Sequence, residues 1–188
     1  MLSATEVEHL VERALAGENE SFSALARAHY RAAYCTALSI VRASADAEDV
    51  VQDAMVSAFT ELESCRESAR FPGWLLSIVR RAALMSLRKR GRARRVEDVA
   101  APADEAAPAS GGDVLLRERL LAAAGALSDR QAEVLFLHDL EGWTHPEIGD
   151  ALGVSEVNAR QILFEARKKM RKRLEESQTP EVSHDGPR

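Results

Sequence analysis

Features that would point to an enzyme, a membrane protein or a secreted protein are scarce in this chain of 188 residues. No apolar run reaches the roughly 20 residues that a membrane-spanning helix needs. The N-terminal stretch MLSATEVEHLVERALAGENE is acidic and has no basic region followed by a cleavage site, so we expect no signal peptide. The two cysteines, Cys35 and Cys65, are too few for a disulfide framework and form no C-x-x-C motif. We expect reduced thiols in a cytoplasmic protein, with a redox or zinc role alongside His29 as the alternative.

Sequence signals of catalysis are missing as well. The chain contains no glycine-rich phosphate loop, no H-E-x-x-H motif and no G-x-S-x-G motif. Its five histidines are scattered and lack the spacing of metal ligands: His9, His29, His138, His145 and His184. We therefore predict a protein that is not an enzyme and that has no cofactor, no metal site and no small-molecule substrate.

Aromatic residues make up only 5% of the chain and β-branched runs are almost absent, whereas alanine and leucine dominate the 46% of hydrophobic residues. This composition favours helices over strands and predicts an all-α fold. Residues 96–112, VEDVAAPADEAAPASGG, lack apolar periodicity, which is typical of a flexible linker. The linker would separate two small helical domains, residues 1–95 and 113–176, and the polar tail at residues 177–188 is predicted to be disordered.

Apolar residues at helical spacing predict four helices in each domain. In the N-terminal domain these helices run from Thr5 to Ala16, from Glu20 to Val41, from an N-cap at Ser44, and from Pro72 to about Arg90. In the C-terminal domain they cover Asp113–Leu127, Asp129–Leu140, His145–Leu152 and Glu156–Glu175. Capping boxes mark two of the starts, Ser128 to Gln131 and Thr144 to Glu147. We expect the N-terminal helices to pack as a bundle.

Charge is distributed in blocks along the chain, although the net charge is only −5. Residues 43–63 carry six acids and no Lys or Arg, and residues 71–95 carry eight bases and no acid. Asp46, Asp49 and Asp53 share one helix face, and such an acidic face favours a basic partner over plain solvation. The bases follow Phe71 and Trp74, which suits the unstacked bases of single-stranded DNA, with core packing of Trp74 as the alternative. The blocks predict partners of opposite charge.

The segment from Thr144 to the end of the last helix has the pattern of a helix-turn-helix. Gly149 is small where a crossing helix must approach, Gly153 supplies the turn, and Ser155 caps the next helix. The inward face of that helix consists of Ala159, Leu163, Ala166 and Met170. Its outward residues near the start, where such a helix meets base edges in the major groove, are Glu156, Asn158, Arg160 and Gln161. A solvated amphipathic helix is the alternative, since Ile162 and Glu165 occupy positions where a phosphate-binding surface favours arginine.

The order of these features resembles that of a known family. The stretches ASADAEDVVQDAMVSAF and FPGWLLSIVRRAALMSLRKR resemble the core of region 2 of bacterial RNA polymerase sigma factors. The stretch LSDRQAEVLFLHDLEGWTHPEIGDALGVSEVNARQILFEARKKMRKRL resembles their region 4. With a short linker in place of region 3, the chain is most similar to the extracytoplasmic-function (group 4) class of the sigma-70 family. The resemblance spans about residues 20–95 and 113–175.

The resemblance implies a role for each charged block. The residues that would dock on the β′ coiled coil of core RNA polymerase are Asp46, Asp49, Gln52 and Asp53. The loop from Glu63 to Phe71 would hold a flipped base of the −10 element, and the path of the melting DNA would be lined by Trp74, Arg80, Arg81, Arg88 and Lys89. Region 4 would contact the β flap and would bind the −35 element through Glu156, Asn158, Arg160, Gln161 and Arg167.

The sequence departs from the family pattern at several of these positions. Arg81 replaces the Asn of the pattern R-N-A-x-D, and the Asp of that pattern is also absent. The reading helix departs from the pattern S-x-G-T-V-K-S-R-L-x-R-A-R at Val157, Asn158, Ala159, Arg160, Gln161, Ile162 and Glu165. The buried positions Leu163 and Ala166 and the final Arg167 are kept, so we expect the fold to be intact and the promoter sequence to be unusual.

The resemblance predicts a sigma factor that binds core RNA polymerase, directs promoter-specific transcription initiation and is held inactive by an anti-sigma factor. It would act in the cytoplasm, or at the inner membrane face when an anti-sigma factor holds it there. The alternatives are a stand-alone helix-turn-helix regulator with an N-terminal helical sensor domain, and a helical sigma mimic that binds other regulators. The acidic stretch DAEDVVQD favours the sigma factor, because a sensor domain has no use for it.

Overall fold

The fold is built of helices joined by short turns, as the composition predicts. The structure is a computed structural model that describes residues 2–96 and 123–176, and within these two ranges every regular element is a helix. Almost all of the predicted linker, the predicted tail and most of the predicted helix Asp113–Leu127 lie outside the described residues.

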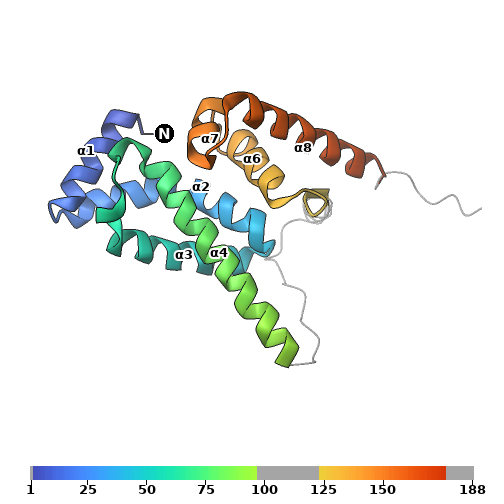
Figure 1. The fold of residues 1–188 in the computed structure, drawn as a ribbon, viewed down its shortest axis with the longest axis horizontal. Helices are drawn as coiled ribbons and strands as arrows, with labels where there is room; N and C mark the ends of the chain where they lie inside the picture. Colours follow the sequence, from blue (N-terminus) through green and yellow to red (C-terminus); the bar gives the residue numbers. More distant parts are fainter. Residues whose placement is uncertain (1, 97–122, 177–188) are drawn as a thin grey trace, which may run out of the picture.

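The two halves of the chain carry separate sets of helices (Figure 1). The N-terminal half contains α1 Ala4–Leu15, α2 Asn19–Val41, α3 Ser44–Thr60, the 3-10 turns η1 Leu62–Ser64 and η2 Ser68–Arg70, and α4 Phe71–Val96. The C-terminal half contains α6 Asp129–Asp139, α7 His145–Leu152 and α8 Glu156–Glu176. The predicted bounds of these helices agree to within one or two residues, except that α4 continues past Arg90 to Val96. The helix predicted to end at Leu127 already ends at Ala124, so that end was predicted three residues too late.

The start of α3 differs from the prediction. Its N-cap is Ala43, and Ser44 is already the first helical residue, without a side-chain capping bond at the helix start. The cause lies one residue earlier, where Arg42 ends α2 in the left-handed conformation with φ 62°. This tight turn leaves only Ala43 between the two helices, so the predicted cap at Ser44 is wrong. Arg42 itself is the one non-glycine residue with positive φ in the described ranges.

The predicted bundle forms around α2, which packs against α1, α3 and α4. Its centre is made of large side chains that are almost completely buried, among them Val11, Leu25, Val51, Phe71, Leu75 and Val79. Each such side chain contributes about 1.5–3 kcal/mol when it is fully buried. The apolar stripes of the helices therefore account for the packing of the N-terminal half.

The C-terminal half lies directly against this bundle, with α6 on α2 and α7 on α4. Figure 1 shows α6 beside α2, while α8 extends away from the body of the molecule. Buried residues of both halves belong to one continuous hydrophobic cluster. We call this contact of α6 and α7 with α2 and α4 the seam. The sequence predicted two domains but not the contact between them.

Candidate functional site

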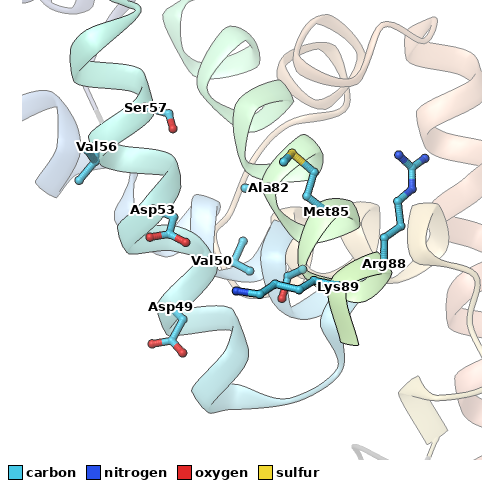
Figure 2. Close-up of a pocket in the computed structure, with 10 residues that line it drawn as sticks. Asp49, Val50, Asp53, Val56, Ser57, Ala82, Met85, Arg88 and Lys89 are labelled. Carbon is cyan, nitrogen blue, oxygen red and sulfur yellow. The ribbon is translucent and has the colours of Figure 1, made fainter. Parts of the chain in front are cut away.

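An open groove runs between α3 and α4 and contains several of the predicted binding residues (Figure 2). Its volume is about 960 Å³, and its lining includes Asp49 and Asp53 from α3 and Arg88 and Lys89 from α4. Figure 2 shows the Lys89 side chain extending from α4 toward α3. One wall of the groove is therefore acidic and the other is basic.

Apolar side chains complete the lining of this groove. Val56 of α3 and Met85 of α4 both line it and are 64% and 62% exposed. A single exposed apolar residue is ordinary, but two that share a groove with charges of both signs form a surface suited to an amphipathic helix. Met85 makes the basic wall of the groove partly apolar.

The predicted polymerase-binding set on α3 divides into two groups. Asp49, Gln52 and Asp53 are exposed, and neither aspartate forms an ion pair with any described residue. Asp46, in contrast, is buried and pairs with Arg90 of α4. The prediction that Asp46 lies on the exposed acidic face is wrong. Asp46 is about one helical turn nearer the start of α3 than Asp49, and there this face of the helix is turned toward α4.

The predicted DNA-binding row on α4 is also not uniform. Arg88 and Lys89 are exposed. Arg81 forms an ion pair with Glu61 at 3.0 Å, and both of these side chains are about half exposed. Trp74 is half-buried, packs against the core and lies with its ring centroid 5.7 Å from that of Phe71. Both alternatives for Trp74 therefore remain compatible with its position: part of the ring packs, and part is accessible.

Arg80 is the cation of the row that is largely covered, with its side chain 23% exposed. Its Nε donates to Glu133 Oε1 of α6 at 2.9 Å, and its Nη2 donates to the carbonyl oxygen of Ala151 in α7 at 3.2 Å. The side chain of Glu133 is only 4% exposed. The structure thus brings a residue predicted to line the DNA path together with an acid from the other half of the chain.

The predicted −10 loop, from Glu63 to Phe71, contains η2 and is largely exposed at its tip, where Arg70 pairs with Glu67 at 2.8 Å. Cys65, at its start, is buried, and burial raises the pKa of its thiol. Burial likewise raises the pKa of the Cys35 thiol to about 12. Both groups are therefore protonated at neutral pH, which disfavours a redox role because the thiolate is the reactive form.

The helix-turn-helix forms as the capping pattern predicts. Thr144 and Glu147 make a reciprocal capping box at the start of α7, and Ser155 Oγ accepts a hydrogen bond from the Asn158 backbone N–H at 3.2 Å. Gly153 ends α7 in the left-handed conformation with φ 66°. A Cβ on Gly149 would lie 2.8 Å from the carbonyl oxygen of Val154, so only glycine allows the turn to approach α7 this closely.

On α8 the predicted base-reading residues are largely engaged with their own helix. Arg160 Nη2 pairs with Glu156 Oε1 at 2.6 Å, and Gln161 Nε2 donates to Glu165 Oε1 at 3.2 Å. Asn158 is exposed, and so is Val157, of which 74% is accessible. The first turns of α8 therefore have an exposed amide and an exposed apolar side chain, while the longer polar groups are paired with exposed local partners.

Three further residues of α8 have contacts within the protein: two that depart from the family pattern and one, Arg167, that keeps it. Ile162 is half-buried and packs against the core, so its position does not face a phosphate. Glu165 is half-buried and accepts the Gln161 amide. Arg167 donates from Nε to Asp139 Oδ2 at 3.2 Å and thereby ties α8 to the end of α6.

Sequence reasoning missed two residues at the seam, Glu133 and Arg42. A signal for Glu133 exists in its neighbours, because Val134, Leu135, Phe136 and Leu137 place apolar side chains all round α6. A helix that is apolar all round is covered on more than one side. An acid next to such a run is buried with it and needs a cation. For Arg42 the sequence contains no comparable signal.

Comparison with known proteins assigns the family. Residues 25–93 match the family model Sigma-70 region 2, and residues 117–170 match the model Sigma-70, region 4. The chain is 32% identical over 170 residues to RNA polymerase sigma factor CarQ of Myxococcus xanthus. This alignment covers 88% of this chain and 96% of CarQ. It is 30% identical over 162 residues to ECF RNA polymerase sigma factor SigM of Mycobacterium tuberculosis, covering 85% of this chain and 80% of the relative.

Solved structures show the same architecture. CnrH in complex with the cytosolic domain of CnrY superposes with a TM-score of 0.66 at 25% identity, covering 93% of this chain and 99% of that one. RpoE of Bartonella quintana, in complex with the anti-sigma factor NepR, superposes with a TM-score of 0.65 at 24% identity over 83% and 98% of the two chains. A helical region 2 followed by a helix-turn-helix region 4 defines a sigma-70-type chain, and this chain belongs to the sigma-70 family of RNA polymerase sigma factors. Within it, the chain is of the extracytoplasmic-function type.

The described ranges contain neither a membrane-spanning helix nor a cluster of metal-binding side chains. None of the helices in residues 2–96 and 123–176 is long and apolar enough to cross a membrane. The same ranges contain no group of three or more His, Cys, Asp or Glu side chains that could hold a metal ion.

Proposed function

We propose that this sigma factor binds core RNA polymerase through the groove between α3 and α4 and directs initiation at promoters with its own −10 and −35 elements. The observation that carries the proposal is the exposed acidic wall of the groove. Asp49 and Asp53 stand beside the apolar Val56 with no ion pair to another described residue. A basic amphipathic helix, such as one strand of the β′ coiled coil, fits this combination of charge and apolar surface.

The test is binding of the full chain to purified bacterial core RNA polymerase, followed by run-off transcription. Asp49→Lys should weaken core binding about tenfold or more, since it places like charges across the interface. Glu12→Lys makes the same charge change on the exposed face of α1 and should leave binding unchanged. If Asp49→Lys binds core normally and no promoter fires, the proposal fails. A stand-alone regulator would instead bind its operator without polymerase.

In this proposal, region 4 binds the −35 element through the start of α8 and contacts the β flap, while α4 and the loop before it hold the −10 element. Arg160→Ala should weaken −35 recognition by about 1–3 kcal/mol if Arg160 leaves Glu156 and contacts a base. DNase footprinting of the holoenzyme measures this, and an unchanged footprint would leave Arg160 facing solvent.

We further infer that an anti-sigma factor controls this protein. The support is that CnrH and RpoE, which share its architecture, were solved in complex with CnrY and with the anti-sigma factor NepR. The chain would act in the cytoplasm, or at the inner membrane face when a membrane-anchored anti-sigma factor holds it. Co-purification of the chain with the product of the adjacent gene tests this inference.

A further inference from the structure

The seam contains an ion pair that is buried on the acid side. Glu133 of α6 reaches the guanidinium of Arg80 at 2.9 Å while its own side chain is 4% exposed. Arg80 also donates to the Ala151 carbonyl oxygen, so α4 is bonded to both α6 and α7 through one side chain. Removing Arg80 would leave this buried carboxylate with only the longer contact to Arg130 of its own helix, at 3.9 Å, so Arg80 is its main compensating charge.

A second arginine bonds the two halves at the other end of the seam. Arg42 donates to the carbonyl oxygens of Ala124 and Leu127 at 2.9 and 3.1 Å, and to Asp129 Oδ1 at 3.1 Å. Carbonyl oxygens at the end of a helical turn carry partial negative charge, which suits a cation. Arg31, whose side chain is exposed, adds a pair with Glu141 at 3.0 Å, and the Glu141 side chain is only 12% exposed. All three arginines belong to the N-terminal half, and all their acceptors named here belong to the C-terminal half.

The backbones also approach closely at the seam. A Cβ on Gly73 of α4 would lie 2.9 Å from the Cα of Ala151 in α7, a distance that real Cβ atoms do not adopt. Gly73 is therefore needed for α7 to reach α4. A cavity of about 370 Å³ adjoins this contact and is lined among others by Gly73, Ala151, His29 and Trp143.

This arrangement cannot bind both promoter elements. Positions −35 and −10 are about 25 base pairs apart, which is roughly 85 Å along B-DNA at 3.4 Å per base pair. In the structure α7 of the helix-turn-helix touches α4, the helix that would hold the −10 element. The halves must separate before region 4 and region 2 can contact their elements together.

We propose that the seam is a closed state of the free chain in which Glu133 occupies the position on Arg80 that a DNA phosphate takes in the open state. The inference rests on the proposed function for its DNA partner. Carboxylate and phosphate compete for the same guanidinium because both accept two parallel hydrogen bonds from it. Region 4 thereby covers one cation of the DNA path and leaves Arg88 and Lys89 exposed.

The test uses Glu133→Gln, which removes the charge and keeps the shape, and Gly73→Ala, which pushes the backbones apart without changing any charge. Glu12→Gln on the exposed face of α1 is the control for the charge change. Small-angle X-ray scattering gives the radius of gyration, and fluorescence anisotropy gives the affinity for a labelled 20-nucleotide single strand. Circular dichroism checks that each full-length variant keeps its helix content.

Both seam variants should have a larger radius of gyration than the unmodified chain and the control. Their affinity for the single strand should rise about three- to tenfold, and the slope of log K against log salt should steepen by about 0.7, as expected for one more phosphate contact. If neither variant expands, the closed state is refuted, whether or not the chain proves to bind polymerase. Expansion without a gain in affinity refutes the competition at Arg80. Should Glu133→Gln fail to fold, Gly73→Ala alone decides both points.

Discussion

Arginine has two different environments in this molecule, the seam and the reading helix. At the seam, Arg80 reaches an acid 53 positions away in the sequence, and that acid is buried. On α8, Arg160 reaches an acid four positions away, and both side chains are about half exposed or more. Exposed pairs of the second kind are worth about 0.3–0.5 kcal/mol, whereas breaking a buried pair by removing one partner costs about 3–5 kcal/mol before any discount for the partial exposure of Arg80.

Only an ion pair between the two halves of the chain can act as a switch. The pair on α8 depends only on its own helix, so it forms in every arrangement of the two halves. The pair at the seam exists only while α6 lies against α4, and it is lost when the halves separate. Region 4 can thus change the charge that α4 presents, whereas the charge at the start of α8 is constant.

The largest expected effect concerns the seam. Protonation of His29, which lies there, should destabilise the protein in acid, whereas no buried histidine of the described residues lies beside the Arg160–Glu156 pair on α8. His29 is 6% exposed, lines the cavity between the halves and has an Nε2 atom without a hydrogen-bond partner. Burial lowers its pKa from 6.5 to about 4. Because the folded-state pKa lies below the unfolded one, the stabilisation is fully present above pH 6.5 and is lost as the pH falls toward 4. The loss should reach at most about 3 kcal/mol.

Urea unfolding at a series of pH values between 4 and 7 measures this dependence. His29→Leu should remove most of the slope, because the variant has no proton to bind at the seam. His9→Gln alters an exposed histidine of α1 and should keep the slope. An equal slope in His29→Leu would show that other groups cause the acid sensitivity.

An intermediate effect compares two glycines, one inside the helix-turn-helix and one at the seam. A Cβ at Gly149 would lie 2.8 Å from the Val154 carbonyl oxygen, within one rigid turn. Gly149→Ala should therefore destabilise region 4 by about 1–3 kcal/mol, less the gain of up to about 1 kcal/mol in helix propensity. Gly73→Ala meets α7, which can move away, so its free energy of unfolding should change less.

Thermal unfolding of the two variants, followed by circular dichroism, checks this order. Gly149→Ala should lower the melting temperature clearly, and Gly73→Ala should lower it little while the molecule expands. The reverse order would mean that the seam is more rigid than the turn between α7 and α8.

Much of the fold follows from the sequence because local signals decide it. The capping boxes at Ser128 and Thr144 formed as predicted, and the inward stripe of α8 is buried at Ala159, Leu163 and Ala166. Each of these features depends on residues within one or two turns, or on a helix face whose period the sequence states directly.

The parts that could not be predicted depend on distant partners. Nothing near Arg80 in the sequence indicates Glu133, and the exposed or buried state of Asp46 depends on Arg90 of another helix. The sequence predicted the acidic wall of the groove, through the spacing of Asp49 and Asp53 on one helix face, but not the groove itself. Its basic and apolar side, with Lys89 and Met85, required the packing of α4 against α3.

The smallest effect concerns Glu156, the acid in the local pair on α8. Glu156→Gln removes an exposed i,i+4 pair and one favourable charge at a helix start, so the free energy of unfolding should fall by less than about 1 kcal/mol. The same change frees Arg160 and removes a negative charge from the end of the helix that would face DNA. Affinity for a mixed-sequence 20-base-pair duplex should therefore rise about two- to fivefold, with no change in the radius of gyration. A larger radius of gyration for Glu156→Gln would contradict the distinction between the two environments. The Arg160–Glu156 pair lies within α8, so breaking it should not separate the two halves.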